Sequence, residues 1–215
     1  MQFVGIFTLG DLPLKVKYGT IIRKITRGRE TPMALLQPNF TFLSYRDVTP
    51  AFLREQGIEV LLSDIDNTLA PYEQPEPDEH IVAWVEALRE AGIKLAFLSN
   101  NHAERVELFN KTLGVPMRYD AHKPLAKNAK KMMRELGGNK KNTALIGDQI
   151  FTDVLCAHLS GFRAILVPPI VDKTDRGTRF KRRLERGPLK RYYKKHPDAP
   201  DIRAGSPLTK EHKTV

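Results

Sequence analysis

Two acidic residues at the end of a short apolar run constrain the fold of this chain more than any other feature. Residues 58–62 are mostly apolar and include a β-branched valine, which favours a buried strand. Asp64 and Asp66 follow two positions apart, before a turn-forming Asn67. The two carboxylates would then stand at the carboxyl end of a strand, where ligands bind in open α/β sheets. Because such close carboxylates repel each other without a cation or a proton between them, the segment predicts a metal site. The alternative is a surface turn rich in Asp and Asn.

Three further polar sites follow in the same manner along the chain. The apolar run at 93–98 ends in Ser99-Asn100-Asn101, and the run at 144–146 ends in the acidic segment 147–153. Between them stands Lys123, followed by Pro124, which favours the first position of a helix. Each polar site therefore ends a predicted strand or begins a predicted helix, and the four together carry much more information than any one alone.

These motifs resemble those of the haloacid dehalogenase (HAD) superfamily of phosphatases. The matching segments are Asp64-Ile65-Asp66-Asn67-Thr68, Ser99, Lys123, and Gly147-Asp148 with Asp153. More closely, the chain is similar to the YqeG-like branch, through Ser99-Asn100-Asn101, Lys123-Pro124 and the later Ile165-Leu166-Val167-Pro168. The resemblance covers roughly residues 35–193, and this branch is similar to phosphatidylglycerophosphate phosphatases.

The resemblance implies a role for each polar residue. Asp64 would be the nucleophile that forms an aspartyl-phosphate, and Asp66 the general acid and base. Ser99, Asn100 and Lys123 would bind the phosphate of the substrate, with the lysine supplying positive charge to the transition state.

The same resemblance implies a Mg²⁺ site. The ligands would be the carboxylates of Asp64 and Asp148 and the main-chain carbonyl of Asp66, and oxygen ligands of this kind suit Mg²⁺. Asp153 would orient Lys123 or a metal-bound water without binding the metal itself. The simpler alternative for Asp153 is an ordinary salt bridge within a helix.

Strands alternating with helices along the chain predict an α/β fold, a Rossmann-like parallel sheet with helices on both faces. Helices are expected from 50, at 79–91, 102–113, 124–136 and 150–160, and strands at 58–63, 93–98, 115–119, 143–146 and 163–167. Asp66 and Ser99 are too close in sequence for an inserted cap domain. A capless site would be open and would suit a phosphate on a large substrate.

We expect three segments: an N-terminal extension at 1–34, the phosphatase domain that the resemblance implies at 35–170, and a basic extension at 171–215. The last segment carries +8 of the net charge of +10. Such a segment favours anionic lipid surfaces or nucleic acid, or it is simply solvated. Gly187-Pro188 is expected to interrupt any long helix, and residues from about 196 are expected to lack fixed structure.

We therefore expect a Mg²⁺-dependent phosphomonoesterase that converts phosphatidylglycerophosphate to phosphatidylglycerol. A soluble or nucleic-acid phosphate is an alternative substrate, and a nucleic-acid- or ribosome-associated binding protein on a HAD scaffold is an alternative class. No apolar run reaches the 18 residues of a spanning helix, and no secretory signal is expected. The single Cys156 suits a reducing interior and is expected to be buried. The expected location is the cytoplasm, with peripheral contact with the inner face of the membrane as an option.

Overall fold

The computed structural model describes residues 33–171 and 176–211. Its six strands form one parallel sheet in the order β1-β6-β5-β2-β3-β4. The strands are β1 (Phe40–Thr41), β2 (Val60–Ser63), β3 (Lys94–Leu98), β4 (Met117–Arg118), β5 (Thr143–Gly147) and β6 (Arg163–Leu166). Five of them match predicted strands, whereas the two-residue edge strand β1 was not predicted.

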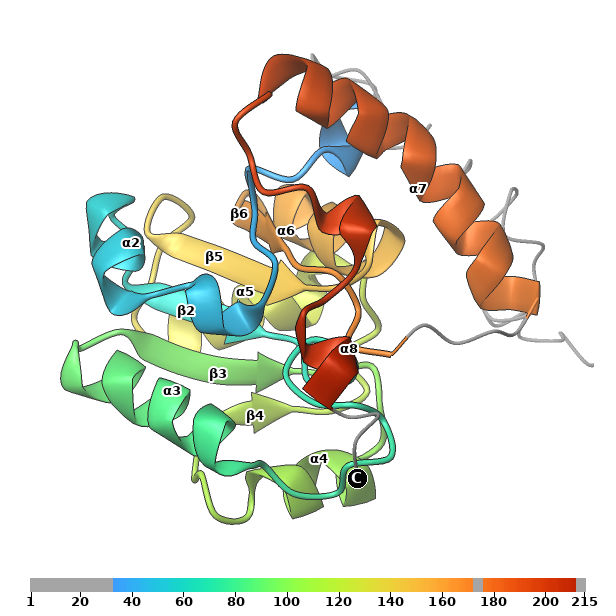
Figure 1. The fold of residues 1–215 in the computed structure, drawn as a ribbon. Coiled ribbons are helices and arrows are strands. Elements are labelled where there is room, and N and C mark those ends of the chain that lie inside the picture. The colour runs from blue at the N-terminus through green and yellow to red at the C-terminus, as the bar shows by residue number, and fades with distance from the viewer. Residues whose placement is uncertain (1–32, 172–175, 212–215) are drawn as a thin grey trace, which may run out of the picture.

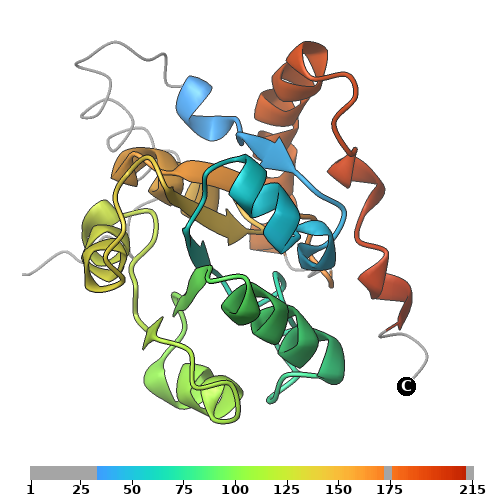
Figure 2. The same ribbon diagram turned by 90° about the vertical axis from the view of Figure 1, so that its left-hand side faces the viewer.

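Helices cover both faces of this sheet, which confirms the predicted fold class (Figures 1 and 2). Those that contribute to one apolar cluster are α2 (Pro50–Glu55), α3 (Glu79–Glu90), α4 (Ala103–Asn110) and the short α8 (Leu208–Glu211). The opposite cluster receives α5 (Ala126–Glu135), the π-helical turn η3 (Ile150–Val154), α6 (Leu155–Ser160) and α7 (Arg176–Lys195). Three 3₁₀ turns, η1 (Ala34–Leu36), η2 (Tyr45–Asp47) and η4 (Ile202–Ala204), complete the order.

Successive residues of the central strands serve opposite faces. Leu61 belongs to the cluster under α3, while Val60 and Leu62 belong to the cluster under α5 and α6. A strand buried on both faces needs a continuous apolar run rather than an alternating one. This requirement explains why β2 is apolar from Val60 to Leu62.

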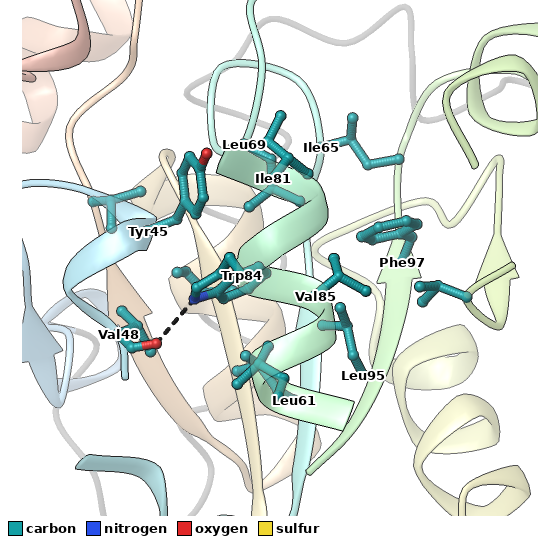
Figure 3. Close-up of a cluster of buried hydrophobic side chains, with 14 of the residues drawn as sticks. Tyr45, Val48, Leu61, Ile65, Leu69, Ile81, Trp84, Val85, Leu95 and Phe97 are labelled. Carbon is teal, nitrogen blue, oxygen red and sulfur yellow. Dashed lines mark hydrogen bonds between the residues drawn. The ribbon is translucent and has the colours of Figure 1, made fainter. Parts of the chain in front are cut away.

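One side of the core is organised around Trp84 of α3 (Figure 3). Its indole N–H donates to the carbonyl oxygen of Val48 at 3.0 Å, so the buried polar edge of the ring is satisfied. The ring of Tyr45 meets it edge-on, with the centroids 5.3 Å apart. Trp84 is therefore a core residue.

Helix starts agree with the sequence in two cases and differ in one. The side chains of Thr49 and Asp78 accept main-chain N–H bonds in the first turns of α2 and α3, as N-caps do. Helix α5 was predicted to begin at Pro124 but begins at Ala126, because Leu125 before it has an extended backbone. Lys123 therefore lies in the loop between β4 and α5 rather than at a helix start.

The C-terminal predictions were wrong in two respects. Helix α7 runs through Gly187 and Pro188 to Lys195, because Leu189 and Tyr192 pack on the core and stabilise its second half. Residues from 196 onward were expected to lack fixed structure, but Ile202, Ser206 and Leu208 are buried.

The structure does not test what was predicted for residues 1–32, because they lie outside the described part of the chain. Among the described helices, none combines the length and the apolar character that a membrane crossing requires.

Candidate active site

The predicted acidic residues meet at the point where the chain order of the sheet reverses. From β2 the chain moves outward through β3 to β4, and it then returns to the other side of β2 as β5. Asp64 follows β2 and Asp148 follows β5, and these two strands are paired neighbours. Ligand sites of open α/β sheets lie outside such a reversal, at the carboxyl ends of the strands.

Three buried carboxylates form a cluster at this point. One oxygen each of Asp64, Asp148 and Asp153 lies within 4.8 Å of the others. The side chain of Asp66 is not part of this group. Asp66 is thus absent from the cluster although it is only two residues from Asp64. The cluster forms because the paired strands β2 and β5 bring Asp64 close to Asp148 and Asp153.

The ammonium group of Lys123 lies between two of these carboxylates. Its Nζ is 2.6 Å from Oδ1 of Asp64 and 2.7 Å from Oδ1 of Asp153. Burial alone would lower the pKa of Lys123, but the charges of Asp153 and Asp64 outweigh it and raise the pKa of the lysine. The ammonium therefore stays charged at every physiological pH.

For Asp64, in contrast, burial outweighs the opposite charge beside it and disfavours the ionised form. Burial raises the pKa of its carboxyl to about 7, and Lys123 opposes that rise while Asp153 adds to it. The hydroxyl of Thr68 donates to its other oxygen, Oδ2, at 3.3 Å. Burial thus favours the protonated form of this carboxyl, and a further cation would favour the ionised form.

The π-helical turn after β5 places Asp153 against this site. Its Oδ2 accepts the main-chain N–H of Gln149 at 3.1 Å, which leaves Oδ1 for Lys123. Gly147 makes the approach possible, because a Cβ at that position would collide with the side chain of Asp153. Asp153 and Lys123 are therefore in direct contact, and a role for Asp153 in orienting the lysine stays a prediction.

Asp66 is held by Arg105, which the sequence did not single out, and by Asn101, to which the sequence gave no role. Its Oδ1 lies 3.1 Å from NH2 of Arg105 on α4, and its Oδ2 accepts from Nδ2 of Asn101 at 3.2 Å. Arg105 also donates to the carbonyl of Pro75 at 3.1 Å, so it ties Asp66 to the proline-rich loop before α3. These contacts fix the direction of the Asp66 carboxylate.

Ser99 and Asn100 follow β3, which lies on the opposite side of β2 from β5. Ser99 is buried, and its hydroxyl oxygen accepts the N–H of Asn101 at 3.0 Å. The side-chain amide of Asn100 makes two bonds to the main chain of Lys123: Oδ1 accepts its N–H at 2.6 Å, and Nδ2 donates to its carbonyl at 3.1 Å. The Asn100 side chain therefore positions the lysine loop.

The donor set fits a hard divalent cation. Three buried carboxylates face one ammonium group, so a fully ionised cluster would carry excess negative charge in a low-dielectric environment. A divalent cation with oxygen ligands would balance that charge and favour the ionised form of Asp64. This buried acidic cluster is consistent with a divalent metal site.

Sequence reasoning missed Arg105 and Glu185, and it named Thr68 and Asn101 within the motifs without giving them a role. Arg105 is one of many arginines in the chain, and only the packing of α4 brings it to Asp66. Glu185 did leave a signal, because it is the sole acidic residue in the basic sequence of α7.

Known proteins resemble this chain in sequence over most of its length. A model of the haloacid dehalogenase-like hydrolase family matches residues 11–161. The chain is also 37% identical over 139 residues to the probable phosphatase YqeG of Bacillus subtilis. This match covers 65% of this chain and 81% of that protein.

Solved structures resemble it more distantly. The cobalt-bound deoxy-D-mannose-octulosonate 8-phosphate phosphatase of Haemophilus influenzae is 14% identical, with a TM-score of 0.44 over 64% of this chain and 90% of that chain. The 3-deoxy-D-manno-octulosonate 8-phosphate phosphatase of Moraxella catarrhalis, solved with magnesium, phosphate and its sugar, is 19% identical. Its TM-score is 0.39 over 46% of this chain and 63% of that chain.

Proposed function

Because this chain belongs to the haloacid dehalogenase-like hydrolase family and is a phosphatase, we propose that it hydrolyses a phosphate monoester through an aspartyl-phosphate on Asp64. The observation that carries the proposal is the buried ion pair of Asp64 with Lys123, beside Asp148 at the reversal of the sheet. A carboxylate nucleophile next to a fixed cation is the arrangement that phosphoryl transfer needs.

Each step of the reaction has a residue to perform it. A carboxylate oxygen of Asp64 attacks phosphorus, and the bond to the leaving oxygen breaks while Asp66 gives that oxygen a proton. Water then attacks the phosphorus of the aspartyl-phosphate, Asp66 takes a proton from the water, and inorganic phosphate leaves with Asp64 restored. Ser99 and Lys123 donate hydrogen bonds to the phosphoryl oxygens as negative charge shifts onto them.

We infer that Asp64, Asp148 and the main-chain carbonyl of Asp66 hold Mg²⁺. Their oxygen donors suit it, and the bound ion would supply positive charge for the phosphate to approach a carboxylate. Asp153 acts on Lys123, which its carboxylate contacts at 2.7 Å. The main-chain N–H groups near Asn100 contribute to phosphate binding.

For the substrate we propose an anionic phospholipid, phosphatidylglycerophosphate, at the inner face of a membrane. Between Asp66 and Ser99, all of it described, the chain contains only a loop, α3 and β3, which supports an open site. In this proposal residues 35–170 form the catalytic domain, 1–34 an extension, and 171–215 a basic extension that contacts the membrane.

The second part of α7, residues 183–195, whose side chains the structure describes, supports that contact. Its buried side carries Leu189 and Tyr192, and its exposed side is basic. The exposed cations of this part are Arg183, Arg186, Lys190, Arg191, Lys194 and Lys195. Each basic residue close to an anionic bilayer contributes about 1 kcal/mol to binding.

A phosphatase panel tests the substrate. Phosphatidylglycerophosphate in mixed micelles is compared with sugar phosphates, nucleotides, phosphopeptides and 5′-phosphorylated RNA, each with Mg²⁺ and with EDTA. We expect the lipid to have the highest kcat/KM, and EDTA to abolish turnover until Mg²⁺ is restored. Higher kcat/KM for a soluble or RNA phosphate would contradict the lipid assignment, and full activity in EDTA would contradict the metal.

A charge-neutralised α7 tests the membrane contact. Changing Lys190, Arg191, Lys194 and Lys195 to Gln should weaken binding to vesicles that contain phosphatidylglycerol and leave hydrolysis of p-nitrophenyl phosphate intact. The matched control neutralises four exposed cations outside α7: Lys127, Lys131, Arg134 and Lys141. Equal vesicle binding by the two variants would remove α7 from the proposal, and tight RNA binding without lipid hydrolysis would favour a nucleic-acid role.

A further inference from the structure

The one acid of α7 is buried and contacts the second acidic loop of the site. Glu185 is only 4% exposed, although it lies within the basic sequence of α7. Its Oε1 accepts the main-chain N–H of Ile150 at 3.1 Å. Ile150 begins the turn that carries Asp153 and lies two residues after Asp148.

This bond completes the start of that turn. The first N–H groups of a helix lack partners within the helix, and buried ones must be satisfied from elsewhere. Here the N–H of Gln149 donates a hydrogen bond to Asp153, and the N–H of Ile150 donates one to Glu185. The loop between Asp148 and Asp153 is therefore held partly by a residue that lies outside the α/β core.

The end of the same extension holds the first acidic loop. Asn67 directly follows Asp66 and adopts a left-handed backbone with φ of 63°. Its carbonyl accepts the N–H of Ile170 at 3.1 Å, and its side-chain oxygen accepts the N–H of Val171 at 3.3 Å. The hydroxyl of Thr209 in α8 donates to the carbonyl of Ile170 at 2.6 Å, which places segment 170–171 between Asn67 and α8.

Burial of an apolar side chain accompanies the second attachment. Leu208 of α8 is buried and belongs to the same apolar cluster as Leu69, Ile170 and Ile65 of the Asp64–Asp66 loop. Figure 1 shows α8 beside that loop, on the side toward which the strands point. The chain that joins α7 to α8 is itself attached to the sheet, because Thr41 of β1 donates to the carbonyl of Pro200 at 2.9 Å.

We propose that residues 176–211 form a brace that holds the two acidic loops of the site at their working separation, with Glu185 and Thr209 as its positioning residues. The inference rests on the proposed function in assigning catalytic and metal-binding roles to those loops. A capless enzyme lacks the support that an inserted domain would give to its loops, and here the C-terminal extension supplies it.

Hydrogen exchange of the full-length, metal-free protein tests the brace without relying on activity. Glu185→Ala should accelerate amide exchange in peptides covering 148–154 by about tenfold or more, because the Ile150 N–H loses its acceptor. Thr209→Val should accelerate exchange in peptides covering 64–70 instead. Glu185→Gln and Thr209→Ser keep an acceptor and a hydroxyl, and both should exchange like the wild type.

Metal binding provides the second readout. Glu185→Ala should weaken Mg²⁺ binding, measured by calorimetry, by about tenfold, as loss of an outer partner of a ligand loop typically does. It should also lower kcat on p-nitrophenyl phosphate with little change in KM, and Glu185→Gln should restore both. Asp198→Ala, which removes an exposed carboxylate of the same extension, is the matched control and should change nothing.

The outcomes separate the brace from the proposed function. Unchanged exchange and unchanged Mg²⁺ affinity in Glu185→Ala would overturn the brace, as would a loss of thermal stability alone. A wild-type protein that hydrolyses no phosphate ester would overturn the proposed function, while the exchange data would still decide the brace. If Glu185→Ala fails to fold, Thr209→Val decides, and unchanged exchange at 64–70 would overturn the proposal.

Discussion

Lys123 and Asp153 form an ion pair of 2.7 Å in which both side chains are almost completely buried. The same ammonium contacts Asp64, so one lysine neutralises charge from two loops of the candidate site. Buried ion pairs contribute little net stability relative to apolar residues. Removal of one partner, however, leaves the other charge buried without an opposite charge to balance it. The pair therefore makes the site sensitive to substitution.

Lys123→Met should show this sensitivity. Methionine keeps the length of the side chain, but it leaves Asp64 and Asp153 without their cation. We expect a loss of about 3–5 kcal/mol in the free energy of unfolding at pH 8, measured with urea, and a much smaller loss at pH 5, where the carboxyls can take up protons. Turnover should fall by about 100-fold or more. An equal loss at both pH values would show that the charges of the pair are not the cause.

Asp64→Asn tests the raised pKa. An acid whose pKa is about 7 in the folded state and 3.8 in the unfolded state destabilises the fold as pH rises between these values, because the folded state binds the extra proton. Asparagine does not titrate. In EDTA, the stability of Asp64→Asn relative to the wild type should therefore increase from pH 4 to pH 8, by on the order of 4 kcal/mol.

The same variant separates stability from catalysis. Since asparagine cannot form the acyl phosphate, Asp64→Asn should retain the fold and lose turnover on every phosphate ester. Urea titrations at four pH values and a phosphate-release assay measure the two effects. A relative stability that stays flat with pH would contradict the raised pKa, and surviving turnover would contradict the nucleophile.

Arg105 should affect Asp66 rather than substrate binding. Arg105→Ala removes the 3.1 Å contact to the Asp66 carboxylate and the bond to the proline-rich loop. We expect kcat to fall by about tenfold to 100-fold, with KM changed less than twofold, because the general acid loses its fixed direction. Arg54→Ala, which removes a cation that bonds the main chain far from Asp66, is the control. A rise in KM with kcat intact would assign Arg105 to the substrate instead.

Gly147→Ala tests the close approach of Asp153. The added methyl group would collide with the Asp153 side chain, so Asp153 must move away from Lys123. We expect a loss of about 1–3 kcal/mol of stability, typical of overpacking, together with a strong loss of turnover. Gly92→Ala is a useful comparison, because a Cβ there meets no atom within 4 Å and only the backbone with φ of 74° is strained. Full activity in Gly147→Ala would show that Asp153 can be displaced without harm.

The sequence by itself determined the class of the fold and the position of the acidic loops. Strands such as β2 are buried on both faces, so their apolar runs are continuous, and the polar residues that end them stand out. The starts of α2 and α3 were predicted correctly as well, because an N-cap such as Thr49 or Asp78 acts on an N–H group three residues away. Features that depend on such local interactions can be predicted from a few consecutive residues.

Only the tertiary structure decided which side chains hold the site together. Asn100 bonds the main chain of Lys123, Arg105 pairs with Asp66, and Glu185 accepts from Ile150. Each of these contacts joins residues more than 20 positions apart, and no local pattern specifies its partner. The same reason explains the C-terminal errors: glycine and proline disfavour a helix locally, yet α7 continues through them because burial of Leu189 and Tyr192 against the core outweighs the local cost.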